Sequence, residues 1–392
     1  MKYFSIHISV FILVAILSSN SLYAQTKFKT SAKGQLSGWT TFNFSDEIKS
    51  QIGGRIIPTI NFDKTFNSKL KLDAEFSLNS TGYLTYTDWN QSDQGESFKP
   101  YRLWLRVSGE KWEVRAGLQK INFGSASMLR PLMWFDQIDP RDPLQLTNGV
   151  YAILGRYYFK NNANLWLWTI GGRQNLKGWE IIKTYGNSPE YGGRFQFPFI
   201  KGELATSYNY RKTYNSSTDL FGTNEILLIM PEHKFGLDGK WDMKIGLWIE
   251  SSYTHNSGVT GPPIALNLLK NRLYNNIGAD YTFGIGNGLN VTYEQLFMTH
   301  AGPEFKDSKT LTFSILALNY PIGLLDNISV MVYYNWGNGD WYRFINFQRS
   351  YNNWSYHLMA FWNPDQFQLY NISDNSNLFA GKGFQLMTVY NF

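Results

Sequence analysis

Polar and apolar side chains alternate along most of the chain, and this pattern constrains the fold more than any other feature. In residues 69–78, apolar side chains occupy every second position, and lysine, aspartate, glutamate and serine stand between them. Successive side chains of a β-strand point to opposite faces, so this strand would have one apolar and one charged face. The same alternation recurs in 101–107, 111–119, 243–253, 289–297 and 354–362. In a membrane barrel, the apolar face would meet lipid and the charged face a wet lumen.

The composition favours such a barrel over other classes. Aromatic residues make up 17% of the chain and charged residues 17%, while the mean hydropathy of −0.31 is too low for a bundle of membrane helices. The chain has no cysteine, which excludes disulfides, thiolate metal sites and cysteine nucleophiles. A net charge of +6 without a long basic run indicates that nucleic acid is not a partner. A soluble propeller is the alternative all-β fold, but no repeat of propeller-blade length is present.

The N-terminus is typical of an exported protein. Lys2 precedes an apolar run over residues 5–17, and small and polar residues follow it up to Ala24. We expect residues 1–24 to be a signal peptide that is cleaved after Ala24. The alternative is a membrane anchor, but the run is shorter than the roughly 20 residues that span a bilayer. Residues 25–32 would then be a short linker, and 33–392 the barrel.

The alternation predicts an antiparallel up-and-down transmembrane β-barrel of about 18 strands. Sixteen strands is the alternative, because residues 341–349 alternate poorly. Short connections rich in Gly, Asn and Asp alternate with long ones, as in outer-membrane barrels. The expected long connections are 81–98, 120–148, 173–189, 212–231, 256–269 and 364–382.

The last strand ends on an aromatic residue. Phe384, Leu386, Thr388, Tyr390 and Phe392 occupy alternate positions up to the C-terminus. This ending resembles the C-terminal assembly signal of Gram-negative outer-membrane proteins. The resemblance implies a location in the outer membrane, insertion by the barrel-assembly machinery, and contact with membrane lipid and lipopolysaccharide.

Residues 120–148 do not alternate, and they are apolar where an exposed loop would be polar. Met128, Leu129 and residues 132–135 form an apolar cluster, and Pro131, Pro140 and Pro143 stiffen the segment. Long loops of this kind are usually packed on another part of the protein. The nearest surface is the inner wall of the barrel, so we expect this one loop to fold inward.

This part of the chain also resembles a known family. It contains Arg115-x-Gly117-x-Gln119 with Phe123-Gly124, followed by residues 136–143. This pattern is similar to the Arg-x-Gly…Gly…Pro-x-Asp segment of large Gram-negative porins, such as the alginate-export and phosphate-selective groups. The resemblance implies a porin-like channel in which an inward loop narrows the lumen. It further implies passive diffusion of small hydrophilic solutes without a cofactor, and a possible homo-oligomer.

Charged residues of the inward segment are the candidate constriction. They are Arg130, Asp136, Asp139, Arg141 and Asp142. The candidate lumen residues on the wall are Arg102, Arg106, Glu113 and Arg115. Opposing charges at a constriction would orient polar solutes and set the ion preference. Alternatively, the Arg–Asp pairs only stabilise the segment. On the wall, we expect a mixed ladder with Asp73 and Glu75 rather than a basic stripe.

Two other function classes stay open at this point. The first is a plugged, non-conducting barrel that acts in polysaccharide or capsule assembly or binds a partner. The second is a barrel hydrolase, for which Ser355 and His357 are the nearest candidates. No histidine pair has metal-ligand spacing, so we expect no enzyme activity, no metal site and no cofactor. Aromatic residues on the predicted lumen face, Trp104, Trp248 and Phe361, are expected to pack against the inward loop rather than to form a sugar track.

Overall fold

The structure is a computed structural model that describes residues 28–44, 47–67, 69–171, 175–218, 225–257, 270–365 and 379–392. The predicted signal peptide lies outside these residues. The strands are β1 (Lys29–Phe44), β2 (Ile48–Asn67), β3 (Leu70–Thr87), β4 (Asn90–Ser108), β5 (Trp112–Gln119), β6 (Val150–Tyr158), β7 (Asn164–Gly171), β8 (Glu190–Phe199), β9 (Gly202–Thr218), β10 (Glu225–Asp242), β11 (Gly246–Asn256), β12 (Asn271–Phe283), β13 (Leu289–Ala301), β14 (Lys309–Pro321), β15 (Asp326–Asn335), β16 (Asp340–Ser350), β17 (Trp354–Trp362) and β18 (Lys382–Asn391).

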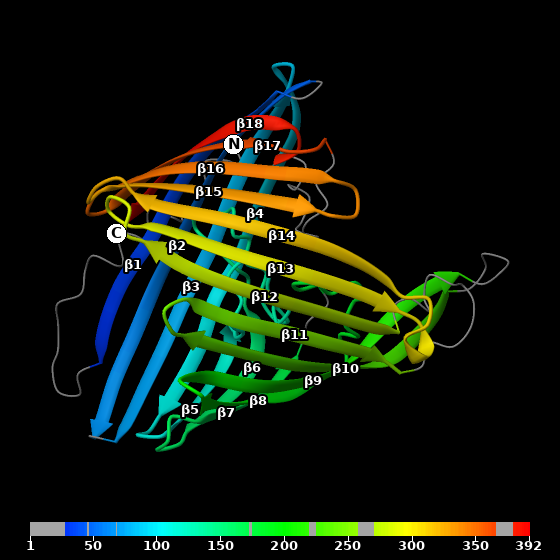
Figure 1. The fold of residues 1–392 in the computed structure, drawn as a ribbon. Helices are drawn as coiled ribbons and strands as arrows, with labels where there is room; N and C mark the ends of the chain where they lie inside the picture. Colours follow the sequence, from blue (N-terminus) through cyan, green and yellow to red (C-terminus); the bar gives the residue numbers. More distant parts are fainter. Residues whose placement is uncertain are drawn as a thin grey trace.

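The strands close into one barrel (Figure 1). Each strand pairs antiparallel with its neighbour in sequence, and β1 pairs with both β2 and β18. The prediction of an 18-stranded antiparallel barrel is confirmed, including the poorly alternating strand β16. A 3-10 turn at Pro303–Phe305 precedes β14. In the part of the chain that the structure describes, no helix is long and apolar enough to cross a membrane.

Three boundaries differ from those expected. The expected long loop 212–231 is mostly strand, because β9 continues to Thr218 and β10 begins at Glu225. Strand β1 begins at Lys29, so residues 29–32, expected in a linker, already pair with β2. The expected long loop 81–98 is instead a β-hairpin whose strands continue to Thr87 and resume at Asn90. Asp88 and Trp89 form its turn with positive φ angles of 46° and 68°. Cross-strand pairing thus extends through polar residues whose composition had indicated a loop.

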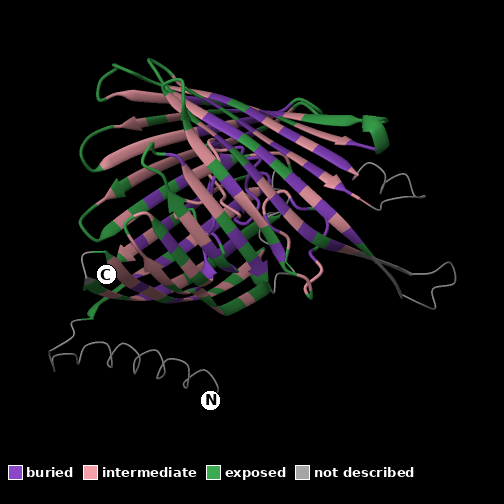
Figure 2. Ribbon diagram, turned by 90° about the horizontal axis from the view of Figure 1, so that it is seen from below, coloured by how far each residue is buried: buried purple, intermediate pink, exposed green. Residues whose placement is uncertain are grey.

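Strand β1 begins and β18 ends at the same end of the barrel, which also carries short connections such as 109–111 and 351–353; we call it the turn end. The opposite end is the loop end, and it carries the long segments 120–149 and 175–189 besides short turns such as that at Asp88 and Trp89. Alternation across the wall follows the sequence pattern, as the striping of buried and exposed residues in Figure 2 shows. Leu103, Leu105 and Ile249 are exposed on the outer face, whereas Glu250 and Glu294 point inward and are buried. In strands such as β3, β4, β11 and β13, the polar face is therefore the lumen face.

The hydrophobic core of the protein lies inside the lumen. Segment 120–149 runs from β5 into the barrel, so the prediction of an inward loop is confirmed. Its apolar side chains pack against the inner faces of β6 and β7. This cluster contains Ile121, Phe123, Leu132, Trp134, Phe135, Val150, Ala152, Leu154, Trp168 and Ile170. Leu129 belongs to a second cluster with inward side chains of β12–β17, including Phe361. Inward apolar residues of the wall thus pack on the segment.

Placing a charge on the outer face should impair insertion. We expect Leu105→Lys to cost ~2–4 kcal/mol if the residue lies near the bilayer midplane, because the ammonium would face lipid. The matched control is Asn61→Lys, which adds the same charge on the lumen face opposite Glu75. Folding yield into bilayers at graded urea concentrations measures the difference. Equal stability of the two variants would contradict the assigned faces.

Candidate functional site: the occupied lumen

The inward segment depends on a tight approach to the wall at Gly124. This residue has a φ of +110°, and a side chain there would place its Cβ 2.4 Å from a carboxylate oxygen of Glu250. Glycine alone meets both requirements, because it has no Cβ and adopts positive φ at little cost. The glycine therefore brings the backbone of the segment directly onto β11.

Two buried carboxylates of the wall then bind the segment through its backbone. Glu250 accepts hydrogen bonds from the amides of Ala126 (2.8 Å) and Leu132 (2.6 Å). Glu294 on β13 accepts bonds from three consecutive amides, Ser127 (2.6 Å), Met128 (3.1 Å) and Leu129 (2.6 Å). A third wall carboxylate, Asp238, accepts the hydroxyl of Ser125 at 3.0 Å. These contacts satisfy backbone donors that would otherwise be buried without a partner.

Charges on the segment itself are mostly paired with one another. The Arg130 guanidinium bonds Asp136 at 3.2 Å, and both side chains are buried. Burial raises the pKa of Asp136 above its ordinary value, although the Arg130 charge opposes this shift. Arg141 and Asp139 form a forked ion pair with distances of 2.6 and 2.8 Å. Asp142 accepts the amide of Leu144 at 2.9 Å.

These pairs favour a stabilising role for the five candidate constriction residues. Arg141 also lies against Phe344 on β16 and Phe379, each with a guanidinium-to-centroid distance of 5.5 Å. The segment thus reaches from β11 and β13 across to β16. Whether its charges also line the path of a solute stays a prediction.

A second segment, residues 175–189, also folds into the lumen, although the sequence indicated a single inward loop. The Trp179 indole donates to the carbonyl of Arg130 at 2.8 Å, so the two segments contact each other. Glu180 bonds Lys234 of β10 at 2.7 Å and Arg211 of β9 at 2.9 Å. The second segment is therefore fixed by ion pairs to the wall, whereas the first is bound mainly through its backbone.

The ion pairs beneath this second segment form a buried network. Arg211 and Arg272 both bind Glu232, and Arg272 does so at 2.5 Å. On the neighbouring strands, Arg194 forms a bidentate pair with Asp238 at 2.5 and 2.9 Å. These pairs could not be predicted from the sequence, because the partners lie far apart in it.

Near the turn end, the wall carries a mixed ladder that includes Asp73 as expected, whereas Glu75 has no ion pair within 4 Å among the described residues. Arg106 contacts Asp73 at 3.1 Å and Glu113 at 3.2 Å, and Arg156 contacts Glu113 at 3.0 Å. Arg115 lies 4.0 Å from Glu113 and stacks over Trp104 with a distance of 4.7 Å to the ring centroid. Cations and carboxylates alternate here, so this part of the wall has little net charge.

Arg102 does not belong to that ladder. It is buried and donates to the carbonyls of Tyr101 (2.6 Å) and Thr147 (3.0 Å). Further towards the loop end, Arg55 donates to the Thr81 hydroxyl at 3.1 Å and lies within electrostatic range of Lys99 and Asp142. Among the described residues, neither Arg55, Lys99 nor Arg102 has a carboxylate within 4 Å. The wall of β2–β4 thus has an excess of positive charge.

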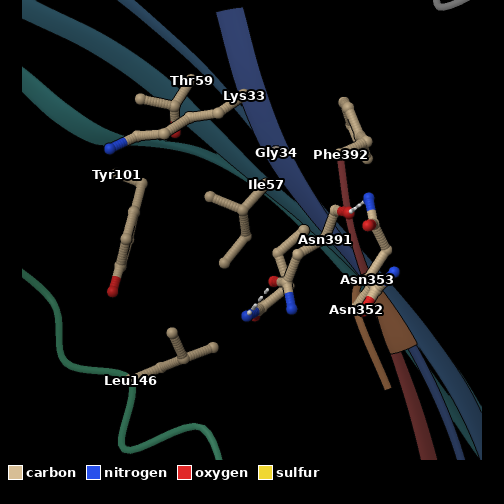
Figure 3. Close-up of a pocket in the computed structure, with 11 residues that line it drawn as sticks. Lys33, Gly34, Ile57, Thr59, Tyr101, Leu146, Asn352, Asn353, Asn391 and Phe392 are labelled. Carbon is tan, nitrogen blue, oxygen red and sulfur yellow. Dashed lines mark hydrogen bonds between the residues drawn. The ribbon is translucent and has the colours of Figure 1, made fainter. Parts of the chain in front are cut away.

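A cavity of about 430 Å³ lies between this wall and the inward segment (Figure 3). Tyr101 of β4 and Leu146 of the segment line one side, and Asn353 and Asn391 lie across from them at the turn end. The other lining residues are Lys33, Gly34, Gln35, Ile57, Thr59, Asn352 and Phe392. The lumen along β1, β2 and β4 therefore keeps a cavity lined by both polar and apolar side chains, whereas the side along β6–β17 is filled.

The hydrolase candidates lack a third group. His357 Nε2 lies 3.3 Å from the Ser355 hydroxyl, but its Nδ1 has no hydrogen-bond partner within the described ranges. Across the same ranges, no group of three or more histidine or carboxylate side chains is placed to hold a metal ion. The aromatic residue Phe361 lies in one cluster with Leu129 of the inward segment, as expected, and also packs against Phe379 at a centroid distance of 5.3 Å. Trp104 instead stacks with Arg106 and Arg115 of the wall.

Comparison with solved structures identifies the fold class. OmpF of Salmonella typhi, in a complex with daunomycin, is similar with a TM-score of 0.52 and 13% identity, covering 94% of this chain and 99% of that chain. OccK5 (OpdH) of Pseudomonas aeruginosa has a TM-score of 0.53 and 11% identity, covering 93% and 98%. OccAB4 of Acinetobacter baumannii has a TM-score of 0.53 and 9% identity, covering 94% and 99%.

At such low identity this likeness shows the fold alone. The chain has the closed barrel of Gram-negative outer-membrane porins. The sequence matches no protein-family model and no curated protein.

Removing the Glu294 charge should loosen the inward segment without opening the barrel. In Glu294→Gln, an amide group would face three N–H donors, so we expect hydrogen exchange at residues 127–129 to accelerate about tenfold or more. Exchange in the amides of β13 and β14 should stay slow. The control Glu203→Gln changes an exposed carboxylate on β9. Unchanged exchange at 127–129 would show that Glu294 does not hold the segment.

Proposed function

We propose that this protein is an outer-membrane channel through which small hydrophilic solutes diffuse passively past a constriction formed by segment 120–149. The observation that carries the proposal is the asymmetric lumen. One side is filled by a folded apolar segment, and the other keeps a cavity between Tyr101, Leu146 and the β1–β2 wall. A barrel of this width leaves an aqueous passage unless its lumen is plugged.

The location follows from the same class of fold. The barrel fold and the similar porin structures support a location in the outer membrane. In our proposal the chain is exported, its signal peptide is cleaved after Ala24, and the barrel-assembly machinery inserts it into the outer membrane. Contact with lipid and lipopolysaccharide would then occur along the outer face. The mechanism needs no cofactor and no catalytic step.

The charge distribution favours anions as the permeating species. The carboxylates Glu250 and Glu294 already accept hydrogen bonds from backbone amides of the inward segment, and the wall ladder near Glu113 is nearly neutral. Arg55 and Lys99 instead add positive charge without a carboxylate within 4 Å among the described residues. A low-dielectric passage focuses the field of such charges, so anions would be concentrated along β2–β4.

A plugged, partner-binding barrel is the second candidate, and the burial of segment 120–149 favours it. Leu129 and Phe135 are 0% and 1% exposed, which shows how completely this segment is packed. Such a barrel could act in polysaccharide assembly through its loops. It differs from a channel in that it would carry little current.

Planar-bilayer recording separates the two functions. We expect steady single-channel currents from the mature protein, and larger currents after deletion of residues 125–145, because that deletion removes the obstruction. The folded state of both proteins is checked by their heat-dependent gel mobility. Absence of current from the folded full-length protein, with current appearing on deletion, would support the plugged barrel instead.

The reversal potential in a salt gradient tests the charge argument. We expect the wild-type channel to prefer chloride over potassium, and Arg55→Gln with Lys99→Gln to shift the preference towards potassium. Lys244→Gln, in an exposed turn between β10 and β11, is the control and should leave the reversal potential unchanged. Cation preference in the wild type would refute the assignment of the path to the β2–β4 wall.

A further inference from the structure

Two cations and a tryptophan form a row across the outer face of the barrel at its loop end. Arg343 on β16 stands opposite Trp362 on β17, and Trp362 stands opposite Lys382 on β18. Arg343 faces outward because its neighbours Tyr342 and Phe344 are fully buried in the lumen. The three side chains therefore lie next to one another on the surface that faces lipid.

Neither cation forms an ion pair with a described residue. The Arg343 guanidinium stacks near Trp341 and Trp362, with distances of 5.6 and 5.7 Å to the ring centroids. Lys382 is exposed. Within the described part of the chain, no carboxylate lies within 4 Å of either side chain. A cation on the lipid face is costly unless it lies at the interface or meets an anion there.

Outward-facing aromatic side chains place the row at a membrane interface. They are Phe42, Phe44, Tyr334, Trp336, Trp341, Trp362 and Phe384. Aromatic residues of barrels gather at the level of the lipid headgroups. Since short turns face the periplasm in bacterial barrels, the loop end faces the outer leaflet.

We propose that Arg343, Trp362 and Lys382 form a binding site for a phosphorylated glycolipid headgroup of the outer leaflet, such as the bisphosphorylated lipid A part of lipopolysaccharide. Strands lie about 4.8 Å apart, so the two cations are about 10 Å apart at the backbone. Their long side chains can therefore converge on one phosphate or bind two phosphates of one headgroup. Trp362 between them offers an apolar face to the sugar or acyl chains.

Arg349, at the other end of β16, differs from Arg343 in having a carboxylate nearby. Arg349 also lies over an aromatic ring, at 5.4 Å from the centroid of Tyr351, but it contacts Asp326 at 3.6 Å. A counter-charge is thus present at the turn end, whereas no described carboxylate lies within 4 Å of Arg343 at the loop end. Charge complementarity to an anionic lipid explains this difference.

Lipid titration by native mass spectrometry of the delipidated mature protein tests the site. The probes are bisphosphorylated lipid A, the same lipid without its phosphates, and inorganic phosphate as competitor. We expect Arg343→Gln combined with Lys382→Gln to weaken lipid A binding by about tenfold or more, because charge-assisted contacts are lost. The control Arg349→Gln should bind as the wild type does, and dephosphorylated lipid should bind the wild type as weakly as lipid A binds the double variant.

Three results would overturn the proposal. These are equal binding of lipid A by the double variant, equal binding of the dephosphorylated lipid, and displacement of lipid A by inorganic phosphate at similar concentration, which would indicate a site for free anions. If the double variant does not fold, Lys382→Gln alone decides the question, because this exposed side chain contributes little to packing. None of these results depends on whether the barrel conducts.

Discussion

The structure depends on how a chain segment without regular strands can be buried inside a barrel. Its backbone N–H groups lose water on entering the lumen and must find acceptors. Glu250 and Glu294 provide them, and Glu294 alone binds three consecutive amides. Charge-assisted bonds of this kind are stronger than neutral ones, so two carboxylates can fix a segment that forms no ladder with the wall.

The position of these carboxylates determines the shape of the lumen. Both lie on the β11–β13 side, so the apolar side chains of segment 120–149 pack against β6, β7 and β12–β17. The second segment adds Trp179 and Glu180 to the same side. The wall from β1 to β4 keeps the cavity beside Tyr101, and a small apolar cluster around Trp39 contacts Leu144 of the segment on this side. The carboxylates Glu250 and Glu294 bind the segment on one side, whereas Arg55 and Lys99, without a carboxylate within 4 Å among the described residues, give the opposite wall its positive charge.

Much of the fold could be predicted from the sequence, because alternation is a local property. It correctly placed Leu105 outside and Glu250 inside, and the apolar run at 128–135 correctly indicated an inward segment. The hairpin around Asp88 and Trp89 was missed because its polar composition resembles that of a loop.

The site was predicted less completely, since it is made by contacts between distant parts of the chain. The sequence identified Arg130 and Asp136 but could not show that they pair with each other inside the segment. It placed Glu294 on a lumen face without showing that residues 127–129 are its partners. Segment 175–189 has no apolar run comparable to that of the first, and its inward position depends on ion pairs with Arg211 and Lys234.

Thiol modification during single-channel recording tests the asymmetric lumen most directly, because the chain has no native cysteine. One variant carries Thr59→Cys beside the cavity, and the other Ser252→Cys on the filled side near Trp134. We predict that a charged methanethiosulfonate reagent reduces the current through Thr59→Cys and leaves Ser252→Cys unaffected. Equal block of both variants, or block of Ser252→Cys alone, would contradict a passage along the β1–β4 wall.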